Sequence, residues 1–210
     1  MRVVTFNIQH GRTPAGRVDV GLVARVCAGF EADVLALQEV DVRRPRSGWV
    51  DTVAVVRRET GMHGVFGRSI RGYGNALFST QPIADVAVVR LPRHGRSEPR
   101  SLLLGRTHGL VFGVLHLSID EAEAQAQLAV ALERRPDVLL GDFNLRPDQL
   151  DGLVPLDEAS SEPTWPADNP RIRIDHVLAL TDAVRVTAAQ VLPAPPVSDH
   201  RPLCTELWRT

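Results

Sequence analysis

The order of hydrophobic and polar positions predicts alternating strands and helices along the whole 210-residue chain. Residues 2–9 alternate as a strand, 33–40 form a second strand, and 18–30 repeat apolar residues at helical spacing. Residues 50–60 are expected to be helical, as is the Ala- and Gln-rich stretch 120–134, which begins with acids and ends with arginines. Turn-bounded apolar runs predict further strands near 63–68, 74–79, 83–91, 101–107, 110–118, 137–142, 172–180, 184–191 and 202–208. Many of these strands follow one another directly, which favours antiparallel pairing. The expected class is α/β, with two packed mixed β-sheets flanked by helices.

Composition narrows the possible functions. With 44% hydrophobic residues, the chain can close one sizeable core, so we expect a single domain over residues 1–210. The net charge of −1 provides no global basic field, which weakens polyanion binding but leaves a local basic patch open. All 24 positive residues are arginine, so lysine Schiff-base chemistry and a P-loop lysine are excluded.

The two cysteines and the lengths of the apolar runs indicate the cellular compartment that we expect for the protein. Cys27 and Cys204 are far apart and show neither a disulfide framework nor zinc-ligand spacing, so we expect buried free thiols. The chain enters a strand at once, and no run approaches the ~18 apolar residues of a membrane span. We expect a cytoplasmic monomer.

Several predicted strands end in acids, amides or histidines, and binding sites gather where strand ends and loops converge. These residues are Asn7, Glu39, His116, Asp142, Asn144, Asp175 and the Ser-Asp-His run at 198–200. Taken singly, each has an ordinary explanation. Glu39 suits a solvated strand end, His116 a buried core histidine, and Asp199 a turn. Asp142 suits the cap of a helix in "LRPDQLDGL", and Asn144 a turn position.

Taken together, the same residues make chemical sense. Magnesium is held by one or two carboxylates, with water and substrate phosphate completing the shell, and Glu39 with Asn7 or Asp199 would supply that set. Asp142 and Asn144, two residues apart on an extended chain, would project to one side and handle one water. Pairing His200 with Asp175 would orient the imidazole and favour its charged form.

The ordered motifs "TFNIQHG", "LALQEVD", "YGNALFST", "GVLHLS", "LLGDFN", "RIDHVL" and "SDHRPL" resemble the endonuclease/exonuclease/phosphatase superfamily over nearly the whole chain. This group includes abasic-site endonucleases, deoxyribonucleases and neutral sphingomyelinases. The resemblance implies a four-layer sandwich. It also implies a metal site at Asn7, Glu39 and Asp199, and catalytic roles for His116, Asp142, Asn144, Asp175 and His200.

The sequence departs from the family at Gln9, where some members carry an acid. Further candidates for substrate contact are His10, Asn75, Arg46 and Arg100, because guanidinium binds phosphate bidentately. The loop 160–170, with Trp165, is a candidate substrate rim or a surface loop with one anchoring aromatic.

The function we expect is hydrolysis of a phosphate ester with Mg²⁺, for which Mn²⁺ could substitute. The short chain and neutral charge slightly favour a small or lipid-derived phosphoester. Nucleic acid stays a possible substrate, which would make the protein a DNA endonuclease or exonuclease. A non-catalytic phosphate-binding module would be expected to lack a member of the set, and here all are present.

Overall fold

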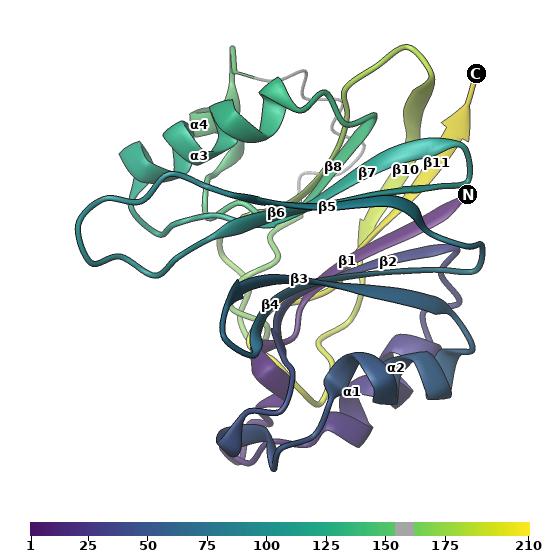
Figure 1. Ribbon diagram of the computed structural model, residues 1–210, viewed down its shortest axis with the longest axis vertical. Helices are drawn as coiled ribbons and strands as arrows, with labels where there is room; N and C mark the ends of the chain where they lie inside the picture. The colour runs from purple at the N-terminus through teal and green to yellow at the C-terminus, as the bar shows by residue number, and fades with distance from the viewer. Residues whose placement is uncertain (154–161) are drawn as a thin grey trace.

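Two mixed β-sheets pack face to face in the computed structural model, which describes residues 1–153 and 162–210 (Figure 1). The six-stranded sheet has the order β10 (Val184–Val191), β11 (Leu203–Arg209), β1 (Arg2–Asn7), β2 (Val34–Asp41), β4 (Tyr73–Ser79) and β3 (His63–Ile70). The five-stranded sheet has the order β5 (Ala84–Arg90), β6 (Ser101–Thr107), β7 (Leu110–His116), β8 (Val138–Asp142) and β9 (Asp175–Ala179). The predicted fold class is confirmed.

Helices cover the outer faces of both sheets. Figure 1 shows α1 (Val20–Ala28) and α2 (Thr52–Thr60) below the six-stranded sheet, and α3 (Glu121–Glu133) and α4 (Pro147–Leu150) beside the other sheet. Two short 3-10 helices, η1 (Gln9–Gly11) and η2 (Pro45–Ser47), lie in loops. An aspartate side chain caps each of the three long helices by accepting a backbone N–H: Asp19, Asp51 and Asp120. The cap at Asp19 makes α1 start later than the predicted 18–30.

The hydrophobic core has three layers, which follow from the alternation of side chains along each strand. One layer packs α1 and α2 onto the six-stranded sheet and includes Phe6, Leu35 and Leu37. The middle layer fills the space between the sheets and includes Val3 and Leu140. The third layer packs α3 onto the five-stranded sheet. The order helix, sheet, sheet, helix is the predicted four-layer sandwich.

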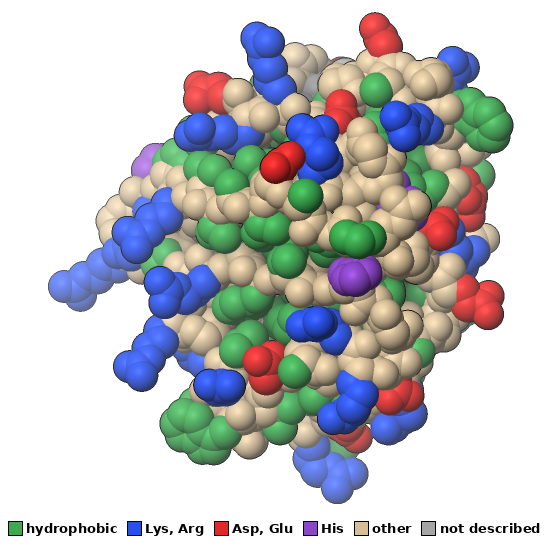
Figure 2. Space-filling model, turned by 45° about the vertical axis from the view of Figure 1, so that its right-hand side comes forward, with side chains coloured by type: hydrophobic (Ala, Val, Ile, Leu, Met, Phe, Trp, Pro, Cys, Tyr) green, Lys and Arg blue, Asp and Glu red, His purple; other side chains and the backbone are tan. Residues whose placement is uncertain are grey.

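Charged side chains are spread over the face of the molecule shown in Figure 2. Several arginines lie on its left side, and acids and hydrophobic side chains lie among the others. Within residues 1–153 and 162–210, no helix is long and apolar enough to cross a membrane. Cys27 and Cys204 are buried and unpaired, as predicted.

Candidate active site

The site lies where the middle core layer reaches the end of the sheets. Val3 on β1, Val114 on β7, Leu140 on β8 and Val177 on β9 face the space between the sheets. Because side chains alternate with a period of two, residues an even number of positions away face the same space. Those positions at the strand ends are Asn7, His116, Asp142 and Asp175, all of which are buried. Alternation therefore gathers four polar groups at one end of an apolar layer.

Glu39 reaches the site through a β-bulge. Leu35 and Leu37 face the α1 and α2 side of their sheet, and so does Val40, so the alternation slips by one residue between them. Pairing of β2 with β4 shifts register at the same place, and Glu39 has a φ of +58°. A bulge re-aims a side chain. Without this one, Glu39 would point into the apolar layer beneath the helices, whereas here it lines the cavity described below.

A tight turn after β8 positions the acid and the amide of "GDFN". The Asp142 Oδ1 atom accepts a hydrogen bond from the Asn144 backbone N–H at 3.0 Å, and the Asn144 side-chain amide donates to the Leu117 carbonyl at 3.1 Å. Asn144 has a φ of +51°, so the chain here is turned, not extended as we expected. The helix-cap explanation is wrong as well, since α4 begins after Arg146.

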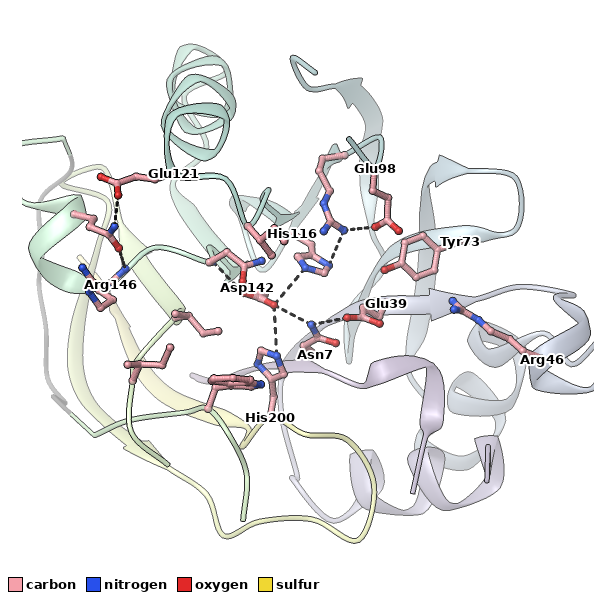
Figure 3. A pocket seen from close by; sticks show the side chains of 17 residues that line it. Asn7, Glu39, Arg46, Tyr73, Glu98, His116, Glu121, Asp142, Arg146 and His200 are labelled. Carbon is pink, nitrogen blue, oxygen red and sulfur yellow. Dashed lines mark hydrogen bonds and ion pairs between the residues drawn. The ribbon is translucent and has the colours of Figure 1, made fainter. Parts of the chain in front are cut away.

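Asp142 is the centre of the contacts in Figure 3. Its Oδ2 atom accepts a hydrogen bond from the Asn7 amide at 2.9 Å, and the same amide lies 3.2 Å from Glu39 Oε1. The Nε2 atoms of His116 and His200 lie 3.4 and 3.7 Å from Asp142 Oδ2. His200 Nδ1 is 2.9 Å from Asp175 Oδ2, as the expected pair requires. One carboxylate oxygen is thus surrounded by an amide and two imidazoles.

The charges of these groups follow from their surroundings. Burial raises the pKa of Asp142 to about 7, against the opposing effect of His200. Burial alone would lower the pKa of His200, but Asp175 and Asp142 raise it to about 10, so this imidazole is cationic at neutral pH. Burial and the Arg100 guanidinium lower the pKa of His116 well below 6.5. The two histidines beside Asp142 are therefore held in opposite charge states.

Glu39 is the ionised acid of the site. Burial alone would raise its pKa, but hydrogen bonding to the His10 ring and to the Asn7 amide helps to lower it to about 2. Its side chain is 22% exposed. A carboxylate that stays charged and reaches solvent is suited to a divalent cation.

A cavity of about 600 Å³ opens above these residues. Its floor holds Asn7, Glu39, His116, Asp142, Asn144 and His200. Three arginines stand in its walls: Arg46, Arg100 and Arg146. Another part of the wall is apolar and consists of Ile119, Trp165, Ile172 and Ile174. Two acids, Glu98 and Glu121, line the cavity as well, and each arginine is paired with an acid: Arg46 with Asp41, Arg100 with Glu98 and Arg146 with Asp148. The cavity thus combines paired arginines with an apolar surface that suits an attached organic group.

Of the four predicted substrate contacts, Arg46 and Arg100 line the cavity, whereas Asn75 and His10 contact other protein groups. Arg46 lines the cavity but is held by two hydrogen bonds to Asp41, at 2.7 and 2.8 Å. Arg100 also lines the cavity. Asn75 is buried, and its amide donates to the Ser101 carbonyl at 3.0 Å, so it supports the backbone next to Arg100. His10 stands beside Glu39 instead, with its Nδ1 atom 3.6 Å from Glu39 Oε2.

Asp199, an expected metal ligand, lines a different cavity from Glu39 and Asn7. Its Oδ2 atom lies 3.4 Å from the Trp165 indole nitrogen, and the residue lines a neighbouring cavity of about 450 Å³. Gln9, at the position where an acid occurs in some relatives, lines that second cavity too. Its backbone N–H donates to Asn7 Oδ1 at 3.0 Å. Trp165, the expected rim residue, lies in the wall of the main cavity, while residues 154–161 of the Pro-rich stretch lie outside the described residues.

Sequence reasoning missed several lining residues. Tyr73 and Arg146 carry no signal beyond their closeness to the motifs. Ile119 did carry one, because it is an apolar residue between Ser118 and Asp120 in a polar stretch of the sequence. In the structure it is 84% exposed. An exposed isoleucine beside a strand-end histidine could have been singled out as a binding residue.

Two groups of residues fit a metal ion to different degrees. Asp142, Asp175 and His200 bring ligand atoms within 4.8 Å of one another. However, His200 is protonated and has no lone pair to offer. Glu39 is ionised and faces the cavity, and Asn7 Oδ1 keeps one lone pair beside its bond to Gln9. The chemistry of the donors therefore favours Glu39 with Asn7.

Comparison with known proteins shows the family to which the chain belongs. Residues 4–200 match the model of the Endonuclease/Exonuclease/phosphatase family, and the chain belongs to that family. It is accordingly a metal-dependent phosphoesterase. A search of curated proteins found no match.

Three solved structures show the same fold. An endonuclease/exonuclease/phosphatase from Beutenbergia cavernae DSM 12333 is 24% identical, with a TM-score of 0.78 over 100% of this chain and 71% of that one. Humanized D. rerio TDP2 is 17% identical, with a TM-score of 0.74 over 99% and 98%. The 3'-5' exonuclease (NExo) from Neisseria meningitidis is 20% identical, with a TM-score of 0.64 over 98% and 99%. At these identities, the likeness concerns the fold alone.

Proposed function

We propose that this protein hydrolyses a phosphodiester whose phosphate sits between Asp142 and Glu39, and that the ester is small or lipid-derived. The observation that carries the proposal is the position of Asp142. Its carboxylate lies at the floor of the cavity, held by Asn7 and flanked by one cationic and one neutral histidine.

Each residue of the floor has a task in this reaction. Asp142, with a pKa raised to about 7, accepts a proton from the attacking water. Asn144 lies next to it in the cavity and orients the water or a phosphate oxygen. His200, cationic because of Asp175, stabilises negative charge that builds up on the phosphoryl oxygens. His116 donates a hydrogen bond to a phosphate oxygen from the side of the phosphate opposite His200.

Glu39 and Asn7 would hold the divalent cation, with Mg²⁺ as the expected ion and Mn²⁺ as a substitute. Oxygen donors and an ionised carboxylate are what a hard cation requires. When bound, the ion would polarise the phosphoryl group and neutralise its charge.

The walls of the cavity support the preferred substrate class. Ile119, Trp165, Ile172 and Ile174 form an apolar wall beside the catalytic floor, which suits an apolar ester arm. The net charge of −1 provides no global basic field of the kind expected of a duplex-binding nuclease.

A nuclease is the second candidate, and Trp165 favours it. The side chain is 37% exposed in the cavity wall, where an aromatic ring can stack on a nucleobase. A structure of D. rerio TDP2 with a single strand DNA product has this fold.

An activity panel tests the proposal. Purified protein with Mg²⁺ is assayed on bis(p-nitrophenyl) phosphate, p-nitrophenyl phosphate, a lysophospholipid, an abasic duplex, single-stranded DNA and plasmid DNA. The expected result is cleavage of the small or lipid diester, with a loss of ~10²–10⁴-fold in Asp142→Asn. Cleavage of the DNA substrates alone would refute the small or lipid-derived ester and support a nuclease. Full activity of Asp142→Asn would remove Asp142 from its role.

A further inference from the structure

Arg100 makes its closest contacts with protein groups, although it lines the cavity. Its side chain is 10% exposed. Its Nη1 atom donates to Glu98 Oε1 at 2.5 Å and lies 3.2 Å from His116 Nδ1. Figure 3 shows Glu98 and the His116 ring on the same side of the site.

The contact between Arg100 and His116 has only one chemically allowed direction. A guanidinium has N–H donors and no acceptor, so His116 Nδ1 must accept and cannot carry a proton. In the neutral ring the proton is then on Nε2, which lies 3.4 Å from Asp142 Oδ2. The arginine thereby determines which nitrogen faces the cavity as a donor.

His200 has the opposite arrangement. Its Nδ1 atom faces the Asp175 carboxylate at 2.9 Å, so this nitrogen is the donor and the ring is cationic. The groups around His116 are Arg100, Asp142, Glu39 and His200, and the nearest partner of its Nδ1 is a cation. A charged His116 would place two positive groups in contact. The neutral ring with Nε2–H is the form that suits these neighbours.

The backbone around Arg100 is anchored on both sides. The Asn75 amide donates to the Ser101 carbonyl, and the hydroxyls of Ser69 and Ser101 are 2.8 Å apart. Earlier in the loop, Ser97 donates to the buried Glu123 of α3 at 2.7 Å. These bonds keep the guanidinium directed at the imidazole.

We propose that Arg100 is a positioning residue, which holds His116 as its Nε2–H tautomer so that this ring donates a hydrogen bond to a phosphate oxygen of the substrate. The inference rests on the proposed function for the role of the donated bond, but the tautomer itself is a property of the protein without substrate. It also differs from a direct phosphate contact by Arg100, since the guanidinium acts through the histidine.

Nitrogen NMR of the intact, ¹⁵N-histidine-labelled protein without metal or substrate tests the tautomer. The His116 signals are assigned by their loss in His116→Gln. At neutral pH, the wild type is expected to show an unprotonated Nδ1 and a protonated Nε2. Arg100→Met should move both signals towards a mixture of tautomers, whereas Arg100→Lys, which keeps a donor, should retain more of the wild-type pattern. Arg46→Met, a cavity arginine held by Asp41, is the matched control and should leave these signals in place.

Kinetics tests whether Arg100 acts through His116. With the ester that is cleaved fastest, Arg100→Met should lower kcat by ~10–10²-fold and leave KM within about twofold, since loss of one oriented donor costs up to ~10²–10³. In a His116→Gln background, the same change should have no further effect on kcat. A rise in KM with unchanged kcat, or full additivity of the two changes, would overturn the proposal.

The two arms keep this inference separate from the proposed function. A wild-type tautomer in Arg100→Met would contradict the positioning role whatever the enzyme cleaves. A protein that cleaves no ester but shows the expected tautomer shift would retain the positioning contact and refute the proposed hydrolysis.

Discussion

Gly141 is the position where one added methyl group should damage the site most. It lies opposite Leu115 in the parallel pairing of β7 with β8, one residue before the pair His116 and Asp142. Its φ of +145° is a conformation that residues with a Cβ rarely adopt. A Cβ at this position would lie 2.0 Å from the Leu115 carbonyl oxygen, whereas real Cβ atoms essentially never come within 3.0 Å.

In Gly141→Ala, the two strands must therefore move apart by about 1 Å, the difference between these distances. The shift falls between the catalytic histidine and the catalytic acid. A 1 Å misplacement of catalytic groups can cost ~10²-fold, so kcat should fall by about this factor. Overpacking should also destabilise the fold by ~1–3 kcal/mol.

The measurements are kcat on the ester that is cleaved fastest and thermal unfolding of the same preparation. Gly29→Ala is the control, because its Cβ would lie 3.5 Å from the Val26 carbonyl oxygen and its φ is −68°. That variant should match the wild type in both measurements. A Gly141→Ala variant with wild-type kcat and stability would refute the close approach of β7 and β8 as a requirement of the site.

Three further predictions concern the metal and the charges of the site. Glu39→Gln should raise the Mg²⁺ concentration needed for half-maximal rate, and an unchanged Mg²⁺ titration would contradict the placing of the ion. A plot of kcat/KM against pH should rise through about 7, as Asp142 loses its proton to become a base, and fall through about 10, as His200 loses its charge. In Asp175→Asn, the falling limb should move to lower pH, since Asp175 is the main group that raises the pKa of His200; a limb that stays at about 10 would assign it to another residue.

The sequence predicted most of the fold because its signals are local. Helical spacing located the long helices, and alternation or turn-bounded apolar runs located the strands. Consecutive strands indicated two sheets. The errors lie at element ends. The predicted strand 172–180 begins at Asp175, because Ile172 pairs only through an isolated bridge to Trp165. The pattern of apolar and polar residues cannot distinguish such a single bridge from a full strand.

The candidate site was predicted because its polar residues end predicted strands. Asn7, His116, Asp142 and Asp175 stand at those ends, and the structure shows that they face the space that is apolar further back. Glu39 was predicted at the end of its strand like the others, but nothing in the sequence indicated the bulge that turns its side chain towards the cavity.

The sequence by itself thus determined which polar groups end the strands and which class of chemistry they suit. The pairing of Asp175 with His200 was expected from the sequence, but only the tertiary structure showed that Arg100 contacts His116 and that Asp199 lies against Trp165. These contacts join residues up to 34 positions apart through atoms a few ångströms from one another. The physical reason is that burial and the charge of the nearest neighbour determine the protonation of a group, and neither is a property of the residue or of its position in the chain.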